Sequence, residues 1–115
     1  MHITVISLSE YYLRGIIPSS ISSFEELTTL SLPKNYINGT LPDSLNSLVM
    51  LESLDLYDNS ISGLLPVAIG NLMNLLHLDL GNNELSGGLS AGLCALTLLE
   101  QLELNDNFFN GTLPS

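Results

Sequence analysis

Residues 51–74 read LESLDLYDNSISGLLPVAIGNLMN, and this stretch decides the fold because its pattern recurs every 24 residues. Leucine, asparagine and glycine return at the same places in the stretches that begin at Leu27 and Leu75, without a gap. Proline returns in the first of these stretches, and Ser90 replaces it in the second. A fixed period of this length indicates a repeat architecture, in which each unit forms one coil and buries its apolar side only against its neighbours. The sequence therefore predicts a solenoid.

The repeats account for a single domain, residues 3–115. They comprise four full units and a partial one, at residues 3–26, 27–50, 51–74, 75–98 and 99–115. A stack of repeats needs polar terminal units, yet the first unit presents apolar residues with nothing before it, and one cysteine cannot make a disulfide-bonded cap. We therefore expect an uncapped piece of a longer product that frays at both ends and self-associates end to end.

Each unit contains two local patterns. The opening Leu-x-x-Leu-x-Leu, for example Leu51 to Leu56, places alternate leucines on one face of a short strand. The closing segment, such as Leu45 to Leu48, repeats its apolar residues every three positions, as short 3₁₀ turns do. We expect the strands of successive coils to form one parallel sheet, with 3₁₀ turns on the opposite, convex side and no long helix.

An asparagine follows the strand segment in every unit after the first. Its amide has two donors and two acceptor lone pairs, so it can bridge backbone groups of its own coil and of the adjacent one. In the first unit Tyr11 stands at this place. We predict a buried structural ladder of four asparagines: Asn35, Asn59, Asn83 and Asn107.

Together these positions give L-x-x-L-x-L-x-x-N-x-[LI]-x-G-x-[LI]-P-x-x-[LI]-x-x-L-x-x. This pattern resembles the plant-type leucine-rich repeat found in the ectodomains of receptor-like kinases and receptor-like proteins, and the resemblance covers residues 3–115. It implies an α/β solenoid, a right-handed leucine-rich repeat superhelix with a concave parallel β-sheet and a 3₁₀ or irregular convex side. The repeat specifies the scaffold and leaves the ligand open.

The charge balance excludes polyanionic partners. Twelve acidic residues against two basic ones give a net charge of −10 and an isoelectric point near 4.1. Nucleic acids and anionic membranes need basic surfaces, so we expect neither as a partner. No apolar run approaches the ~18 residues of a membrane span, and the first ten residues lack a signal-peptide pattern. We expect no direct membrane insertion by this segment.

Candidate binding residues are the non-leucine positions around Leu-x-Leu, which project from the concave sheet. Seven of the twelve acids gather there in the third to fifth units, with two amphipathic side chains among them. The predicted ligand-binding set is Glu52, Asp55, Tyr57, Asp58, His77, Asp79, Glu100, Glu103 and Asp106.

Three interpretations of this acidic surface stay open. It can dock a basic peptide or protein, with Tyr57 and His77 as amphipathic contacts. It can equally be a solvated face that keeps a leucine-rich rod soluble. A calcium site is the third, and it is disfavoured because Ca²⁺ takes about six to eight converging oxygens, which a flat sheet does not supply.

Two acceptor sequons for N-linked glycans occupy the same place in the repeat. They are Asn38-Gly39-Thr40 in the second unit and Asn110-Gly111-Thr112 in the fifth. A tripeptide this short also arises by chance. Because the resemblance implies an extracellular setting, we predict glycosylation at Asn38 and Asn110, with both side chains exposed.

The sequence offers no supporting pattern for catalysis. His77 lies among acids, but no nucleophile with an orienting partner accompanies it except Ser53, and a flat sheet has no pocket that excludes water. We expect no enzyme activity, no cofactor and no metal. Cys94, in a convex segment, is expected to be a semi-buried thiol, with an intermolecular bridge or a reactive centre as alternatives.

Two functions fit these observations. The resemblance implies a protein- or peptide-binding segment of a plant-type cell-surface receptor-like kinase or receptor-like protein, located extracellularly or at the cell surface as part of a longer membrane protein. The alternative is a secreted inhibitor or structural interaction protein of the same fold, similar to polygalacturonase inhibitors. Both expect a protein or peptide ligand, which the acidic face suggests is basic.

Overall fold

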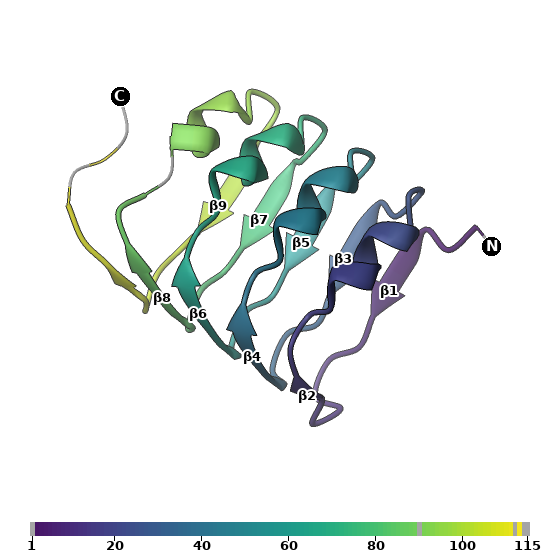
Figure 1. Cartoon of the computed structure of the whole chain (residues 1–115), viewed down its shortest axis with the longest axis horizontal. Helices are drawn as coiled ribbons and strands as arrows, with labels where there is room; N and C mark the ends of the chain where they lie inside the picture. The colour runs from purple at the N-terminus through teal and green to yellow at the C-terminus, as the bar shows by residue number, and fades with distance from the viewer. Residues whose placement is uncertain (1, 90, 112, 114–115) are drawn as a thin grey trace.

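The computed structural model describes residues 2–89, 91–111 and 113. The chain winds into successive coils that stack side by side from the N-terminus to the C-terminus, as Figure 1 shows. Each coil carries one strand on either side of a narrow apolar interior, and 3₁₀ helices line the third side. The stack measures 41 × 29 × 22 Å. This arrangement confirms the predicted leucine-rich repeat solenoid.

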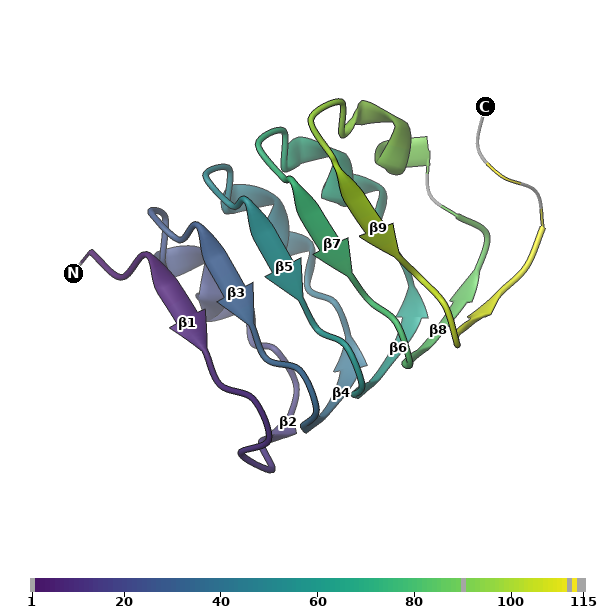
Figure 2. The same cartoon turned by 180° about the vertical axis from the view of Figure 1, so that it is seen from behind.

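The first strands of the coils form a five-stranded parallel sheet, called here the main sheet (Figure 2). Equivalent residues 24 positions apart pair directly, so that Leu30 lies beside Leu54 and Leu54 beside Leu78. All three leucines are completely buried, because alternation turns them toward the interior. The strands are β1 (Val5–Ser7), β3 (Thr29–Ser31), β5 (Ser53–Asp55), β7 (His77–Asp79) and β9 (Gln101–Glu103).

A second five-stranded parallel sheet follows the asparagine turn, and sequence analysis did not predict it. In β4, buried Ile37 separates exposed Tyr36 and Asn38, which is the period of two of a half-buried strand. Only a few residues in each unit carry this pattern, so it is hard to recognise in the sequence. The strands, in sheet order, are β10 (Phe108–Phe109), β8 (Glu84–Gly87), β6 (Ser60–Leu64), β4 (Tyr36–Thr40) and β2 (Arg14–Gly15).

Short 3₁₀ helices return the chain to the next coil. Proline precedes each of the first three in an extended conformation, with Pro42 at φ −73° and ψ 142°, for example. Because proline fixes φ and lacks an N–H donor, it suits this position before a helical turn. No longer helix occurs in the described residues, and none could cross a bilayer. The helices are η1 (Ser19–Ser23), η2 (Asp43–Ser47), η3 (Val67–Asn71) and η4 (Ala91–Ala95).

The ladder asparagines hold each turn to the preceding coil. The Nδ2 of Asn83 donates to the carbonyl oxygens of Leu56 in the preceding coil, at 2.9 Å, and of Leu80 in its own, at 3.2 Å. Its Oδ1 accepts the backbone N–H of Ile61, again in the preceding coil, at 3.0 Å. Equivalent bonds between coils are made by Asn35, Asn59 and Asn107.

The expectation for Cys94 was wrong, because its side chain is exposed. It lies in η4, where no residue is buried, unlike η1, η2 and η3, which each bury one aliphatic side chain. The period of three places Leu93, and not Cys94, against the apolar core. Cys94 therefore lies on the outer side of its helix.

Candidate binding surface on the main sheet

The main sheet aligns three carboxylates on neighbouring strands. Asp55 of β5 pairs in register with Asp79 of β7, and Asp79 pairs with Glu103 of β9. Parallel strands lie about 4.8 Å apart, so the three side chains form a continuous row across the sheet. All three are partly buried. We call Asp55, Asp79 and Glu103 the carboxylate row.

Hydrogen bonds orient the carboxylates of this row. The Oδ1 of Asp55 accepts the backbone N–H of Tyr57 at 3.0 Å, and the Oδ1 of Asp79 accepts that of Gly81 at 2.9 Å. These turns arise from the sequence, since an aspartate readily accepts a backbone N–H two residues further on. At the end of the row, Glu103 Oε1 accepts a bond of 2.6 Å from the side-chain amide of Gln101.

Asp79 lies in the middle of the row, between two other carboxylates. Partial burial is the main cause that raises the pKa of Asp79 above its ordinary value. The hydrogen bond from the Gly81 N–H opposes this, while repulsion from Asp55 and Glu103 and a hydrogen bond with Glu103 raise the pKa of Asp79 further. A cation placed over the row would relieve this repulsion.

A second row lies beside the first. Ser53, His77 and Gln101 are in register on the same strands, and with Asp55 and Asp79 they line a shallow hollow of about 140 Å³. His77 is exposed, and among the described residues its side chain makes no hydrogen bond with that of Ser53. The rows therefore present acceptors and an imidazole to solvent.

The other predicted site residues lie around these two rows. Glu52 and Glu100 are exposed and immediately precede strands β5 and β9. Beyond the opposite ends of the strands, Asp58 accepts a bond of 2.8 Å from Asn82 Nδ2, and Asp106 accepts one from Asn105. The predicted set is thus spread along the length of the strands.

Tyr57 is half-buried, and it lies over a residue without a side chain. A Cβ added to Gly81 would approach Tyr57 Cδ1 to 3.3 Å and the Oδ1 of Asn105 to 2.9 Å. Gly81 itself is buried. The absence of a side chain at Gly81 thus makes room for the aromatic ring beside the carboxylate row.

The turn after each main strand contains a residue in the left-handed region. Lys34, Asp58, Asn82 and Asp106 have φ values between 53° and 58°, and Glu10 has 62°. Asp and Asn tolerate this conformation better than other non-glycine residues, which fits three of these positions. Asp58 and Asp106 therefore belong to a backbone turn, a constraint that sequence analysis did not foresee.

One part of the surface that sequence analysis missed is apolar. Met50, Asn74, Leu76 and Leu98 join Glu52 around a hollow of about 360 Å³ at the start of the main strands. Met50 and Leu98 are 46% and 52% exposed. The signal was available, since both are large apolar residues outside the buried positions of the repeat.

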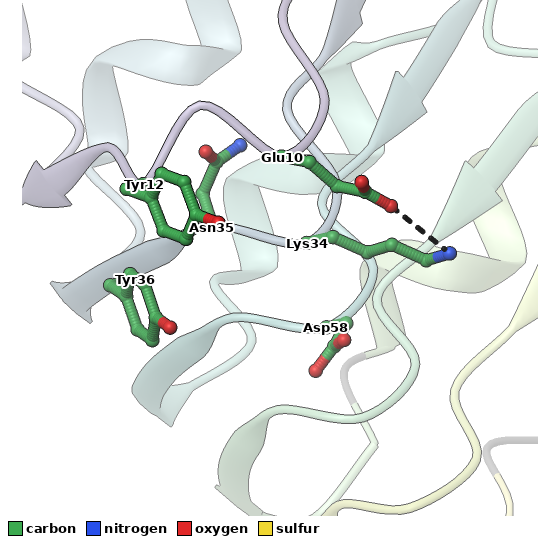
Figure 3. A pocket seen from close by; sticks show the side chains of 6 residues that line it. All are labelled: Glu10, Tyr12, Lys34, Asn35, Tyr36 and Asp58. Carbon is green, nitrogen blue, oxygen red and sulfur yellow. Dashed lines mark ion pairs between the residues drawn. The ribbon is translucent and has the colours of Figure 1, made fainter.

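A third hollow, also missed, lies between the first three coils (Figure 3). Its volume is about 420 Å³. Tyr12 and Tyr36 lie on one side, with ring centroids 6.1 Å apart, and the Lys34 Nζ to Glu10 Oε1 ion pair of 3.6 Å lies on the other (Figure 3). Asp58 and the ladder residue Asn35 complete the lining. Both basic residues of the chain are nearby, because Arg14 Cζ lies 4.9 Å from the Tyr36 ring centroid.

Two further expectations concern metals and glycans. Within the residues that the structure describes, no group of three or more His, Cys, Asp or Glu side chains is arranged to hold a metal ion.

The two predicted glycan acceptors, Asn38 and Asn110, are both exposed. Thr112, the last residue of the second sequon, lies outside the described residues.

The family follows from sequence and structure together. A leucine-rich repeat family profile matches residues 50–109, and another matches residues 26–48. The first covers more than half of the chain, which therefore belongs to the leucine-rich repeat family. No curated relative matches the chain in sequence.

Solved plant receptor structures resemble the chain closely. The plant peptide hormone receptor RGFR1 in complex with RGF2 gives a TM-score of 0.95 at 29% identity, over 97% of this chain and 18% of the receptor. The ectodomain of the Arabidopsis thaliana receptor kinase SOBIR1 gives a TM-score of 0.94 at 35% identity, and the match covers 97% of this chain and 61% of that ectodomain chain. A third similar structure is the ectodomain of the Arabidopsis thaliana receptor kinase GASSHO1/SCHENGEN3 in complex with CASPARIAN STRIP INTEGRITY FACTOR 2. Its TM-score is 0.92 at 37% identity, and the match covers 94% of this chain and 13% of that chain. The chain thus spans less than two thirds of each.

Proposed function

We propose that the chain is a peptide- or protein-binding segment of a plant-type cell-surface receptor ectodomain, and that its ligand is basic. The observation that carries the proposal is the carboxylate row, in which Asp55, Asp79 and Glu103 lie in register and partly buried on the main sheet. Extracellular location and a longer membrane-anchored parent are part of the same proposal. The likeness to receptors solved with RGF2 and with CASPARIAN STRIP INTEGRITY FACTOR 2 supports it.

The surface fits an extended ligand with a basic and an apolar side chain. A Lys or Arg over Asp79 would make charge-assisted hydrogen bonds with up to three carboxylates and reduce their mutual repulsion. An aliphatic side chain would enter the hollow between Met50, Leu76 and Leu98. The apolar contact supplies buried area, while the charges supply orientation and speed of association.

We propose that binding at this surface involves no catalysis. His77 is the candidate base, but it is exposed, and its hollow of about 140 Å³ is shallow. Acid–base and nucleophilic chemistry needs an oriented base and exclusion of water. The surface therefore acts through recognition alone.

A peptide-binding experiment tests the proposal with isosteric substitutions. The probe is a fluorescent decapeptide of alternating Arg and Leu, with Glu replacing Arg in the reference peptide. We expect the triple variant Asp55→Asn, Asp79→Asn, Glu103→Gln to bind the basic peptide at least about 10-fold more weakly, a loss of ~1.4 kcal/mol. Binding by the unaltered chain should also weaken as salt rises from 50 to 300 mM, because exposed charges are screened.

The matched control changes three acids elsewhere. Glu25→Gln, Asp43→Asn and Glu84→Gln alter the net charge by the same amount, and all three residues are exposed outside the main sheet. This variant should keep the affinity within about twofold, since only screened long-range attraction is lost. Equal losses in both triple variants would show that net charge, and not the carboxylate row, attracts the peptide.

We propose in addition that the isolated chain self-associates through its end coils. In the described residues, β1 and β9 each pair on one side only. Val5 of β1 is 54% exposed and Leu102 of β9 is 43% exposed. Unpaired strand edges with apolar side chains favour pairing between chains.

A further inference from the structure

The exposed face of β4 presents an aromatic ring beside a glycan acceptor. Tyr36, Asn38 and Thr40 are exposed, whereas Ile37 between the first two is buried. Alternate residues of a strand project to the same side, so the Tyr36 ring and the Asn38 amide are neighbours on one face. Within the described residues, the Asn38 side chain makes no hydrogen bond, in contrast to the ladder amide of Asn35.

The Tyr36 ring is fixed by the first coil. Tyr12 stacks with it at an interplanar angle of 16°, with 6.1 Å between the ring centroids. The guanidinium of Arg14, which pairs with Tyr36 in the sheet register, lies 4.9 Å from the ring centroid. Cation–π and aromatic contacts of this kind favour one orientation of the ring. Figure 3 shows the two tyrosines side by side at the edge of the third hollow. We call Tyr12 and Tyr36 the tyrosine shelf.

The pairing of an aromatic residue with an acceptor asparagine recurs in another coil. Phe108 of β10 precedes Asn110 by two residues and is 65% exposed. The two intervening coils carry neither feature, since their equivalent positions are Ser60 with Ser62 and Glu84 with Ser86. In the first coil the equivalent positions are Tyr12 and Arg14, so an aromatic occurs there without an acceptor, and it stacks on Tyr36.

We propose that the tyrosine shelf seats the first N-acetylglucosamine of a glycan attached to Asn38. The inference rests on the extracellular setting of the proposed function. In the modification, Asn38 Nδ2 forms a bond to the anomeric carbon of a lipid-pyrophosphate-linked oligosaccharide, the lipid pyrophosphate leaves, and the amide loses one proton. The secretory host supplies this donor and the transferase.

The chemistry of the shelf suits a sugar ring. A pyranose presents C–H groups with partial positive charge on one face, and the face of a tyrosine ring is negative. The attached sugar starts two residues from Tyr36, so little conformational freedom is lost when it packs on the ring. The contact covers exposed aromatic surface, because Tyr36 is 48% and Tyr12 71% exposed.

The test compares glycosylated and unglycosylated chains with and without the ring. All chains are secreted from a eukaryotic host with Asn110→Gln, and the glycan on Asn38 is trimmed to a single N-acetylglucosamine. Thr40→Ala removes the sequon and gives the unglycosylated reference. We expect the sugar to raise the Tm by about 2–6 °C, the shift of one favourable aromatic contact in a chain of 115 residues, and we expect Tyr36→Ser to abolish this increment.

The matched control is Phe108→Ser, an exposed aromatic of the same repeat position in β10, which should leave the increment intact. Any loss of stability caused by Tyr36→Ser itself cancels, because each increment is measured within one background. A second readout is the N-acetyl methyl proton, whose NMR signal should move upfield over the ring and return in Tyr36→Ser.

The outcomes separate this inference from the proposed function. An equal Tm increment with and without Tyr36, together with an unshifted methyl signal, would refute the contact between the sugar and the tyrosine shelf. It would not affect the proposed peptide binding. Unmodified Asn38 after secretion would contradict the shelf and also count against the extracellular setting. Failure of the Arg-Leu peptide to bind would leave the shelf standing, since no peptide is present in this experiment.

Discussion

A single ladder asparagine makes hydrogen bonds with several backbone groups at once. Replacing Asn83 by Ala would leave the Ile61 N–H without its side-chain acceptor, in a position where only 6% of Asn83 is exposed. It would also remove one of the two side-chain donors of the Leu56 carbonyl, which would keep only Asn59 Nδ2. Buried polar groups left unpaired cost about 1–3 kcal/mol each. We expect Asn83→Ala to lower the free energy of unfolding by about 3 kcal/mol in urea titrations.

The comparison for this prediction is Asn71→Ala. Asn71 is exposed in η3, and its side chain makes no hydrogen bond within the described part of the chain. Substitutions at such positions change stability by about 0.5 kcal/mol or less. If Asn83→Ala lowered the free energy of unfolding as little as Asn71→Ala does, the ladder hydrogen bonds would not stabilise the fold.

At the scale of the strands, the carboxylate row makes stability depend on pH. Because the pKa of Asp79 is raised in the folded chain, the folded state binds this proton more tightly than the unfolded state. Stability therefore falls as pH rises from the ordinary aspartate range through the raised value. Asp79→Asn, whose amide oxygen can still accept the Gly81 N–H, should raise the Tm at pH 7.

The gain in Tm from Asp79→Asn should shrink as pH falls. It should vanish below the ordinary aspartate range, where Asp79 is protonated in both the folded and the unfolded state. Thermal unfolding between pH 3 and pH 7 measures it. Asp43→Asn, an exposed change in η2 outside the row, should not reproduce the effect. A gain from Asp79→Asn that stayed constant over this range would exclude the titration of Asp79 as its origin.

At the scale of the whole molecule, the strand edges should control self-association. Lysine on an edge strand disfavours pairing between chains, because a buried charge would result. We expect Val5→Lys on β1 to lower the dimer fraction that light scattering detects as concentration rises. Val67→Lys adds the same charge on η3, where Val67 is 72% exposed, and should leave association unchanged. A monomer at every concentration in the unaltered chain would refute association through the ends.

The sequence by itself determined the coil, because the spacing of Leu51, Leu54 and Leu56 and the place of Asn59 leave one way to bury these three leucines together. The same 24-residue register aligned Asp55 with Asp79 and Glu103, so the row was predictable in outline. These features depend on position within the repeat, which can be read directly from the chain.

Only the tertiary structure decided how side chains of adjacent coils meet. The raised pKa of Asp79, the stacking of Tyr12 on Tyr36 and the exposure of Cys94 depend on burial and on ring orientation, which the period does not specify. The second sheet also appears only when coils are stacked, since its strands are as short as two residues and exist through pairing with a neighbour. The physical reason is that a repeat fixes the path of the backbone, whereas contacts between coils depend on the individual side chains that differ from one unit to the next.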